Sequence, residues 1–213
     1  MKDIYVTVKS RGSAEVKVRG SRFLGVAVAV TSESDVQDTL HSVRKSYHDA
    51  RHHCFGYRLG ASASIFRSND DGEPGGTAGP PILQQIEARD LTNTLVVVTR
   101  YFGGTKLGRG GLARAYGDAA GFALDDAGTI EHTILRSHRV RFDYDDTARA
   151  MRVIEAMGGR VVKADYLNST SLVVEVRASA SDTFQARFVE ELAGRGEIRV
   201  LDERDDEAES RFD

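Results

Sequence analysis

The chain has 213 residues, of which 40% are hydrophobic and 29% are charged, and its formal net charge is −3 at pH 7. This composition excludes wholesale disorder, and the slightly acidic balance excludes a domain that binds nucleic acid through bulk positive charge. The single cysteine, Cys54, excludes an internal disulfide. Because no signal peptide or apolar membrane span is evident, we expect a cytoplasmic protein without membrane contact.

Hydrophobic periodicity predicts five strands and three helices in the N-terminal part of the chain. The expected strands cover 4–8, 14–19, 23–30, 52–59 and 94–99. The run at 94–99 is almost wholly apolar, which indicates a central strand buried on both faces. The expected helices begin after Ser32 or Ser34, at Pro80 and near Leu112. Residues 68–79 and 103–111 are rich in glycine and are expected to be loops.

From about residue 135 the pattern changes. Strands are expected over 135–144, 161–167, 171–177 and 198–201, and helices over 147–157 and 182–193. The order β-α-β-β-α-β is that of the split βαβ unit of ferredoxin-like folds. We therefore predict an α+β fold with two domains, 1–134 and 135–202, followed by a short acidic tail at 203–213.

A glycine-rich segment links the predicted central strand to the helix that follows it. The first N–H groups of a helix have no partner within the helix, and the helix dipole favours an anion beside them. Basic side chains lie on both sides of this helix start, so the sequence predicts an anion or nucleic-acid site. The residues expected to form it are Arg100, Lys106, Gly108, Arg109, Gly110, Gly111 and Arg114.

Two other interpretations of the glycine-rich segment stay open. The glycines can serve only to let the loop pack closely against the sheet, and the same surface can dock a protein partner. The spacing of the segment matches neither a Walker A loop nor a dinucleotide-binding fingerprint, so no particular nucleotide is indicated.

Two clusters of polar residues precede this segment. Asp70, Asp71 and Glu73 are candidates for a Mg²⁺ or Ca²⁺ site, but their spacing is not that of an EF-hand, and a solvated acidic turn is the simpler interpretation. The second cluster is His48, His52, His53 and Cys54, in which the cysteine and a histidine can form a nucleophilic pair or the cluster can form part of a metal site. A lone cysteine among aromatic residues is more often a small buried hydrophobe. We expect no cofactor, no metal and no catalytic residue.

The spaced motifs of the N-terminal part are similar to those of the IMPACT family, and in particular of its bacterial YigZ-type branch. The motifs are Ser21–Gly25, His53-Cys54, the run Asp70–Gly79, Gly79–Leu83, Arg100–Gly104 and Leu107-Gly108. The resemblance extends over essentially the whole chain. It implies an N-terminal domain like those of a ribosomal small-subunit protein, elongation factor G domain IV and the galactokinase-type small-molecule kinases. It also implies a ferredoxin-like C-terminal domain similar to one in elongation factor G.

The resemblance also implies a role in translation. Eukaryotic relatives restrain the activation of a starvation-sensing translation kinase by competing for its ribosome-associated activator, and they use an additional N-terminal protein-binding domain. This chain begins at its first predicted strand, so we do not expect that mechanism to transfer unchanged. The family offers no established catalytic residue to carry over.

Together, the motifs and the resemblance lead us to expect a translation-associated regulatory protein rather than an enzyme. It would bind RNA or a ribosome-associated protein through the glycine-rich basic surface. The first alternative is a nucleotide- or phosphate-dependent enzyme that uses the same loop, with Asp70, Asp71 or Glu73 on Mg²⁺. The second alternative is a protein-docking module, and a small-molecule ligand also stays open.

Overall fold

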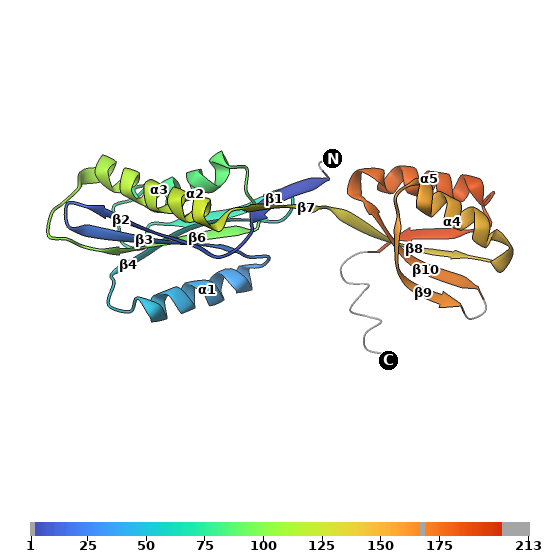
Figure 1. Cartoon of the computed structure of the whole chain (residues 1–213), viewed down its shortest axis with the longest axis horizontal. Coiled ribbons are helices and arrows are strands. Elements are labelled where there is room, and N and C mark those ends of the chain that lie inside the picture. The colour runs from blue at the N-terminus through green and yellow to red at the C-terminus, as the bar shows by residue number, and fades with distance from the viewer. Residues whose placement is uncertain (1–2, 167–168, 202–213) are drawn as a thin grey trace. The chain divides into compact units, whose positions relative to one another are not determined.

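The computed structural model describes residues 3–166 and 169–201. The described residues form two compact units, one of Ile4–His132 and one that runs from Thr133 onward and includes Asp3 (Figure 1). Each unit has its own sheet, helices and hydrophobic core, which confirms the predicted mixed α+β architecture in two parts. The predicted acidic tail, 203–213, lies outside the described residues.

The N-terminal unit is a layered sheet with helices on both faces (Figure 1). Its elements are β1 (Ile4–Val8), β2 (Gly12–Val18), β3 (Ser21–Ala29), α1 (Glu33–Ser46), β4 (His52–Leu59), β5 (Ile65–Asn69), α2 (Gly79–Ala88), β6 (Thr94–Tyr101), α3 (Gly108–Ala127) and β7 (Thr129–Thr133). Five strands form an antiparallel sheet in the order β2-β3-β6-β4-β5, and β1 pairs with β7. Helices α2 and α3 cover one face of the sheet, and α1 covers the other.

The central strand β6 is buried on both faces, as its apolar sequence predicts. Val96 and Val98 belong to the core beneath α2 and α3. Leu95 and Val97 belong to the core beneath α1. Because side chains alternate along a strand, β6 contributes to two cores at once and is fixed at the centre of the unit.

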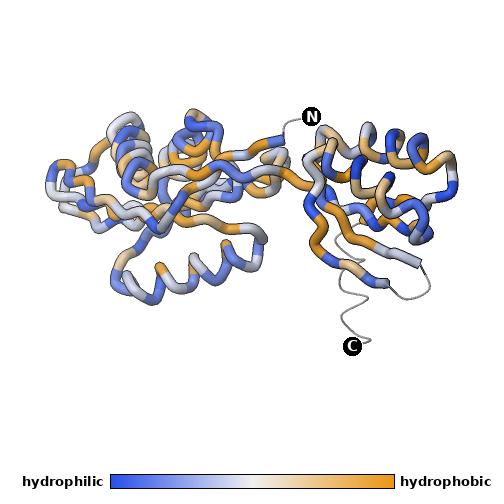
Figure 2. The backbone as a smooth tube through the Cα atoms, turned by 45° about the vertical axis from the view of Figure 1, so that its right-hand side comes forward, coloured by the Kyte–Doolittle hydropathy of each residue, from blue (hydrophilic) through white to orange (hydrophobic). Residues whose placement is uncertain are grey.

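Helix α1 begins where the sequence indicates. The Ser32 hydroxyl accepts a hydrogen bond from the Asp35 N–H at 3.1 Å, and the Asp35 carboxylate accepts one from the Ser32 N–H at 3.1 Å. This reciprocal capping satisfies two N–H groups at the helix start. The buried residues Val36, Leu40 and Val43 form one stripe, and the tube in Figure 2 accordingly changes between hydrophobic and hydrophilic along the helix.

The structure differs from the prediction in three elements of this unit. Strands β5 and β7 were not expected, because both are short and largely exposed and therefore give little hydrophobic periodicity. Helix α3 begins at Gly108, inside the segment predicted to be a loop. Leu107 and Leu112 pack with the core, and their burial offsets the cost of about 1 kcal/mol for each glycine in the first turn.

The C-terminal unit has the predicted order of elements. They are β8 (Leu135–Phe142), α4 (Thr147–Ala156), β9 (Arg160–Tyr166), β10 (Thr170–Arg177), α5 (Ser181–Glu191) and β11 (Glu197–Val200). The strands form an antiparallel sheet in the order β11-β8-β10-β9. Helices α4 and α5 pack on one face over a core that includes Val140, Phe142, Val174, Phe184 and Phe188 (Figure 1).

The described residues contain no helix that combines the length and the apolar character needed to cross a membrane.

Candidate functional site

The predicted site residues lie in two loops of the N-terminal unit and in the strand and helix that flank the second loop, and a buried polar group connects the two loops. One loop runs from β5 to α2, and the other runs from β6 to α3. Glu73, in the first loop, accepts hydrogen bonds on Oε1 from Arg100 Nη1 and from the Tyr116 hydroxyl, each at 2.7 Å. Arg100 lies near the end of β6 and Tyr116 lies on α3, so a single carboxylate fixes the first loop to both elements.

A second contact brings the same loop to the start of α3. Arg109 Nη2 donates a hydrogen bond to the carbonyl oxygen of Gly75 at 2.8 Å. The exposed residues around this contact form what we call the glycine-rich surface: Gly75, Gly76, Gly104, Lys106, Gly108, Arg109 and Gly110. Gly111 is half-buried behind them, and Arg114 is exposed one turn further along α3.

The start of α3 is open to an anion. Among the described residues no side chain caps this helix, and its first turn contains no acidic residue. The helix is 20 residues long, so the partial positive charge at its N-terminus is fully developed. Lys106 and Arg109 add two exposed cations beside the uncapped N–H groups.

The glycines in and beside the glycine-rich surface differ in how strongly the backbone requires glycine. A Cβ on Gly103 would lie 1.8 Å from the carbonyl carbon of Gly20, so this residue is fixed by close packing against the turn between β2 and β3. Gly108 has a φ of +72°, which disfavours other residues. Gly110 has neither constraint, since a Cβ there would meet open space. Packing therefore explains Gly103 but does not explain Gly110.

The structure corrects the prediction for Arg100. Its side chain is 7% exposed and pairs at 2.7 Å with Glu73, whose side chain is 4% exposed. The guanidinium also lies over the rings of Phe23 and Phe102, at 5.5 and 5.4 Å from their centroids. Arg100 is thus a buried ion-pair partner that holds the first loop in place, and it is not available to a ligand at the surface.

The three candidate metal ligands are not brought together. Asp70 accepts hydrogen bonds from the backbone N–H groups of Gly76, Ala78 and Gly79, at 2.8 to 2.9 Å. Asp71 accepts one from the His53 N–H at 2.7 Å, and Glu73 is occupied as described above. The described residues contain no group of three or more His, Cys, Asp or Glu side chains that could hold a metal ion.

Asp70 instead organises the loop. Burial opposes ionisation of its carboxyl group, but the backbone hydrogen bonds from Gly76, Gly79 and Ala78 outweigh burial, so the pKa of Asp70 lies below its ordinary value. Two of these donors are at the N-terminus of α2, which the carboxylate therefore caps from a distance in sequence. Capping explains why an acidic residue precedes this glycine-rich loop.

The cysteine and histidine pair is structural. Cys54 is fully buried, and its thiol donates a hydrogen bond to the Asp70 carbonyl oxygen at 3.0 Å. Burial raises the pKa of Cys54 to about 12, so the nucleophilic thiolate is scarce at neutral pH. His53 is also buried, and one of its ring nitrogens lies 3.0 Å from the Thr99 hydroxyl, while burial lowers the pKa of this histidine.

Tyr116 is a polar member of this site that the sequence motifs did not indicate. The side chain is completely buried, yet its hydroxyl bonds Glu73, and burial raises the pKa of Tyr116. A buried tyrosine generally needs a partner for its hydroxyl, which is the one signal that was present in the sequence. The identity of the partner depends on the fold.

Two family models match the chain. The model of the Impact N-terminal domain matches residues 19–124, and a model described as a domain of unknown function, DUF1949, matches residues 140–195. The first includes the whole glycine-rich surface. The second lies within the C-terminal unit.

Curated relatives and a solved structure agree with these matches. "IMPACT family member YvyE" of Bacillus subtilis is 33% identical over 92% of this chain and 90% of its own. "IMPACT family member YigZ" of Escherichia coli is 30% identical over 87% of this chain and 91% of its own. "Protein IMPACT homolog" of Saccharomyces cerevisiae is 37% identical over 42% of this chain and 36% of its own. A crystal structure titled as that of a hypothetical protein covers 95% of this chain and 100% of its own, at 27% identity and a TM-score of 0.69. The chain therefore belongs to the IMPACT family.

Proposed function

We propose that this protein is a cytoplasmic, translation-associated regulator that binds the phosphates of RNA, free or on the ribosome, through the glycine-rich surface. The observation that supports this proposal most directly is the uncapped N-terminus of α3 beside the exposed cations Lys106 and Arg109. Such a helix start offers backbone N–H donors and a favourable dipole to a phosphate. Gly108 and Gly110 leave the backbone accessible there.

The buried group behind the surface supports the same proposal. Because Glu73, Arg100 and Tyr116 hold the first loop, the Gly75 carbonyl is in place to fix the Arg109 side chain. A cation fixed in this way loses less conformational freedom when it meets a phosphate. Contacts of this kind position a nucleic acid without reading its sequence.

Family membership supports a role in translation, in line with the role of the eukaryotic relatives. We also propose that the C-terminal unit is ferredoxin-like and that the N-terminal unit belongs with elongation factor G domain IV. The strand order β11-β8-β10-β9 with two helices on one face supports the first assignment. These two fold kinships would place both units among domains that work on the ribosome.

The test is a salt titration of binding to ribosomes and to a labelled oligouridine, with the wild type and Lys106→Ala/Arg109→Ala. Each lost phosphate contact on a single strand lowers the salt slope by about 0.7, so the double variant should lose about 1.4. Lys9→Ala/Arg11→Ala is the matched control, since it also removes one exposed lysine and one exposed arginine. These two residues lie at the other end of α3, as the hydrogen bond from the Lys9 N–H to the Gly128 carbonyl oxygen shows. Wild-type binding that does not depend on salt, or an unchanged slope in the double variant, would refute the proposal.

A further inference from the structure

The C-terminal unit has a basic sheet face that the proposed function does not use. Helices α4 and α5 pack on the face formed by His138, Val140 and Phe142, so the alternate residues of β8, Arg139 and Arg141, lie on the opposite face. Within this unit the described residues place no helix on that opposite face. We call it the open sheet face.

Basic residues from three of the four strands form a row across the open sheet face, with Val173 of β10 between them. Arg199 of β11 pairs in register with Arg139 of β8, Arg139 with Val173 of β10, and Val173 with Lys163 of β9. Residues paired in register share a face. Three spacings of about 4.8 Å between neighbouring strands make this row about 14 Å long.

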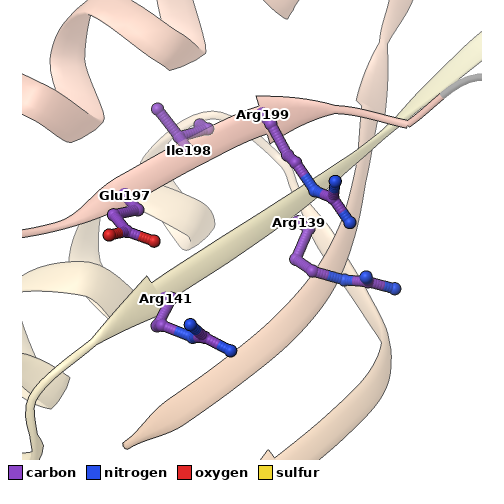
Figure 3. A pocket seen from close by; sticks show the side chains of 5 residues that line it. All are labelled: Arg139, Arg141, Glu197, Ile198 and Arg199. Atoms are coloured by element: carbon purple, nitrogen blue, oxygen red, sulfur yellow. The ribbon is translucent and has the colours of Figure 1, made fainter.

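Arg141 lies two residues beyond Arg139 on β8, in a neighbouring row that also contains the carboxylates of Glu197 and Asp165. Arg139, Arg141 and Arg199 line one hollow of about 420 Å³. Figure 3 shows their guanidinium groups spread along the sheet and not converging on a single point. Glu197, opposite Arg141, is the acidic residue among those that line the hollow. An arrangement spread over this length suits a repeating polyanion better than one isolated phosphate.

The row contains one like-charged pair. Arg139 and Arg199 are directly opposite one another, and like charges in that position destabilise a sheet. The whole chain has a net charge of −3, so the row is not part of a general positive excess. No aromatic side chain belongs to the row, and base stacking is therefore not what it offers.

We propose that the open sheet face is a second, independent nucleic-acid contact, which binds the phosphate backbone of a single RNA strand. A row of about 14 Å is long enough to meet more than one phosphate of a single strand. The contact does not require the glycine-rich surface, because it is formed entirely by residues of the C-terminal unit. Binding is independent of base sequence, since phosphates are the groups recognised.

The experiment measures fluorescence anisotropy of labelled oligouridine on the full chain from low to high salt. Arg141→Gln/Arg199→Gln removes two exposed cations from the open sheet face, and Arg152→Gln/Arg187→Gln removes two exposed arginines from α4 and α5 on the other side. Two lost contacts lower the salt slope by about 1.4, which weakens binding about 60-fold at 50 mM and about tenfold at 200 mM salt. The control variant Arg152→Gln/Arg187→Gln should change the salt slope and the affinity much less than this. Glu197→Gln should strengthen binding, because it removes the acid at the hollow.

The outcomes separate this proposal from the proposed function. Loss of binding in Lys106→Ala/Arg109→Ala with an unchanged slope in Arg141→Gln/Arg199→Gln would overturn the second contact and keep the first. The reverse pattern would support the second contact and remove the first. If RNA affinity stays the same and the sedimentation coefficient of Arg141→Gln/Arg199→Gln falls below that of the wild type, the face binds a second copy of the chain and the proposal is overturned. A truncated chain that ends at Leu201 lacks the acidic tail. If this truncation raises the RNA affinity of the wild type but not that of Arg141→Gln/Arg199→Gln, the open sheet face binds RNA and the acidic tail competes for it.

Discussion

Replacing Glu73 with glutamine tests whether the buried ion pair holds the glycine-rich surface together. The Glu73 and Arg100 side chains are 4% and 7% exposed and lie 2.7 Å apart. Glu73→Gln keeps the size of the side chain but leaves the Arg100 cation buried without its counter-charge. Among the described residues Arg100 Nε already has no hydrogen-bond partner, so these residues offer little to replace the lost charge.

Removing one partner of a buried ion pair costs about 3 to 5 kcal/mol of unfolding free energy. For a unit of this size we expect the melting temperature to fall by about 10 to 15 °C. The assay is thermal unfolding followed by circular dichroism. Hydrogen exchange of β6 and α3 identifies the transition of the N-terminal unit, because two units need not unfold together.

Glu73→Gln/Arg100→Met is the decisive control, since it removes both charges and fills the space with an apolar chain. Replacing both partners of a buried pair is often close to neutral, so the double variant should regain most of the lost stability. A loss of less than about 1 kcal/mol in Glu73→Gln, or a double variant less stable than the single one, would refute the reasoning.

Two further predictions concern the loops. Gly103→Ala should lower the free energy of unfolding, measured by urea denaturation, by about 1 to 3 kcal/mol, because its Cβ would overlap the backbone of Gly20. Gly110→Ala should raise the same free energy by about 0.5 to 1 kcal/mol, because its Cβ would meet open space. Equal effects at the two sites would contradict this account. Because backbone hydrogen bonds hold the pKa of Asp70 below its ordinary value of 3.8, Asp70 stabilises the folded state above that pH, and this contribution is lost as the pH falls further. Asp70→Asn should therefore unfold less steeply with acid below about pH 3.8 than the wild type does, and parallel curves for the two proteins would be the contrary result.

The sequence by itself determined the elements with strong periodicity. The apolar run of β6, the Ser32 cap and buried stripe of α1, and the β-α-β-β-α-β order of the C-terminal unit were all predictable, because local pattern and burial agree in them. The spaced glycine and arginine motifs also sufficed to indicate the family.

Only the tertiary structure decided which polar residues meet. Nothing in the sequence distinguishes Arg100 from Lys106, but the fold buries Arg100 against Phe23 and Phe102 and leaves Lys106 exposed in the loop before α3. Tyr116 acquires a polar partner because the loop that contains Glu73 folds back over α3. The open sheet face likewise depends on strand register, which places Arg139 beside Arg199 although they are far apart in the chain. Local patterns report the burial of single residues, whereas ion pairs and charged faces depend on contacts between distant segments, and these contacts exist only once the chain has folded.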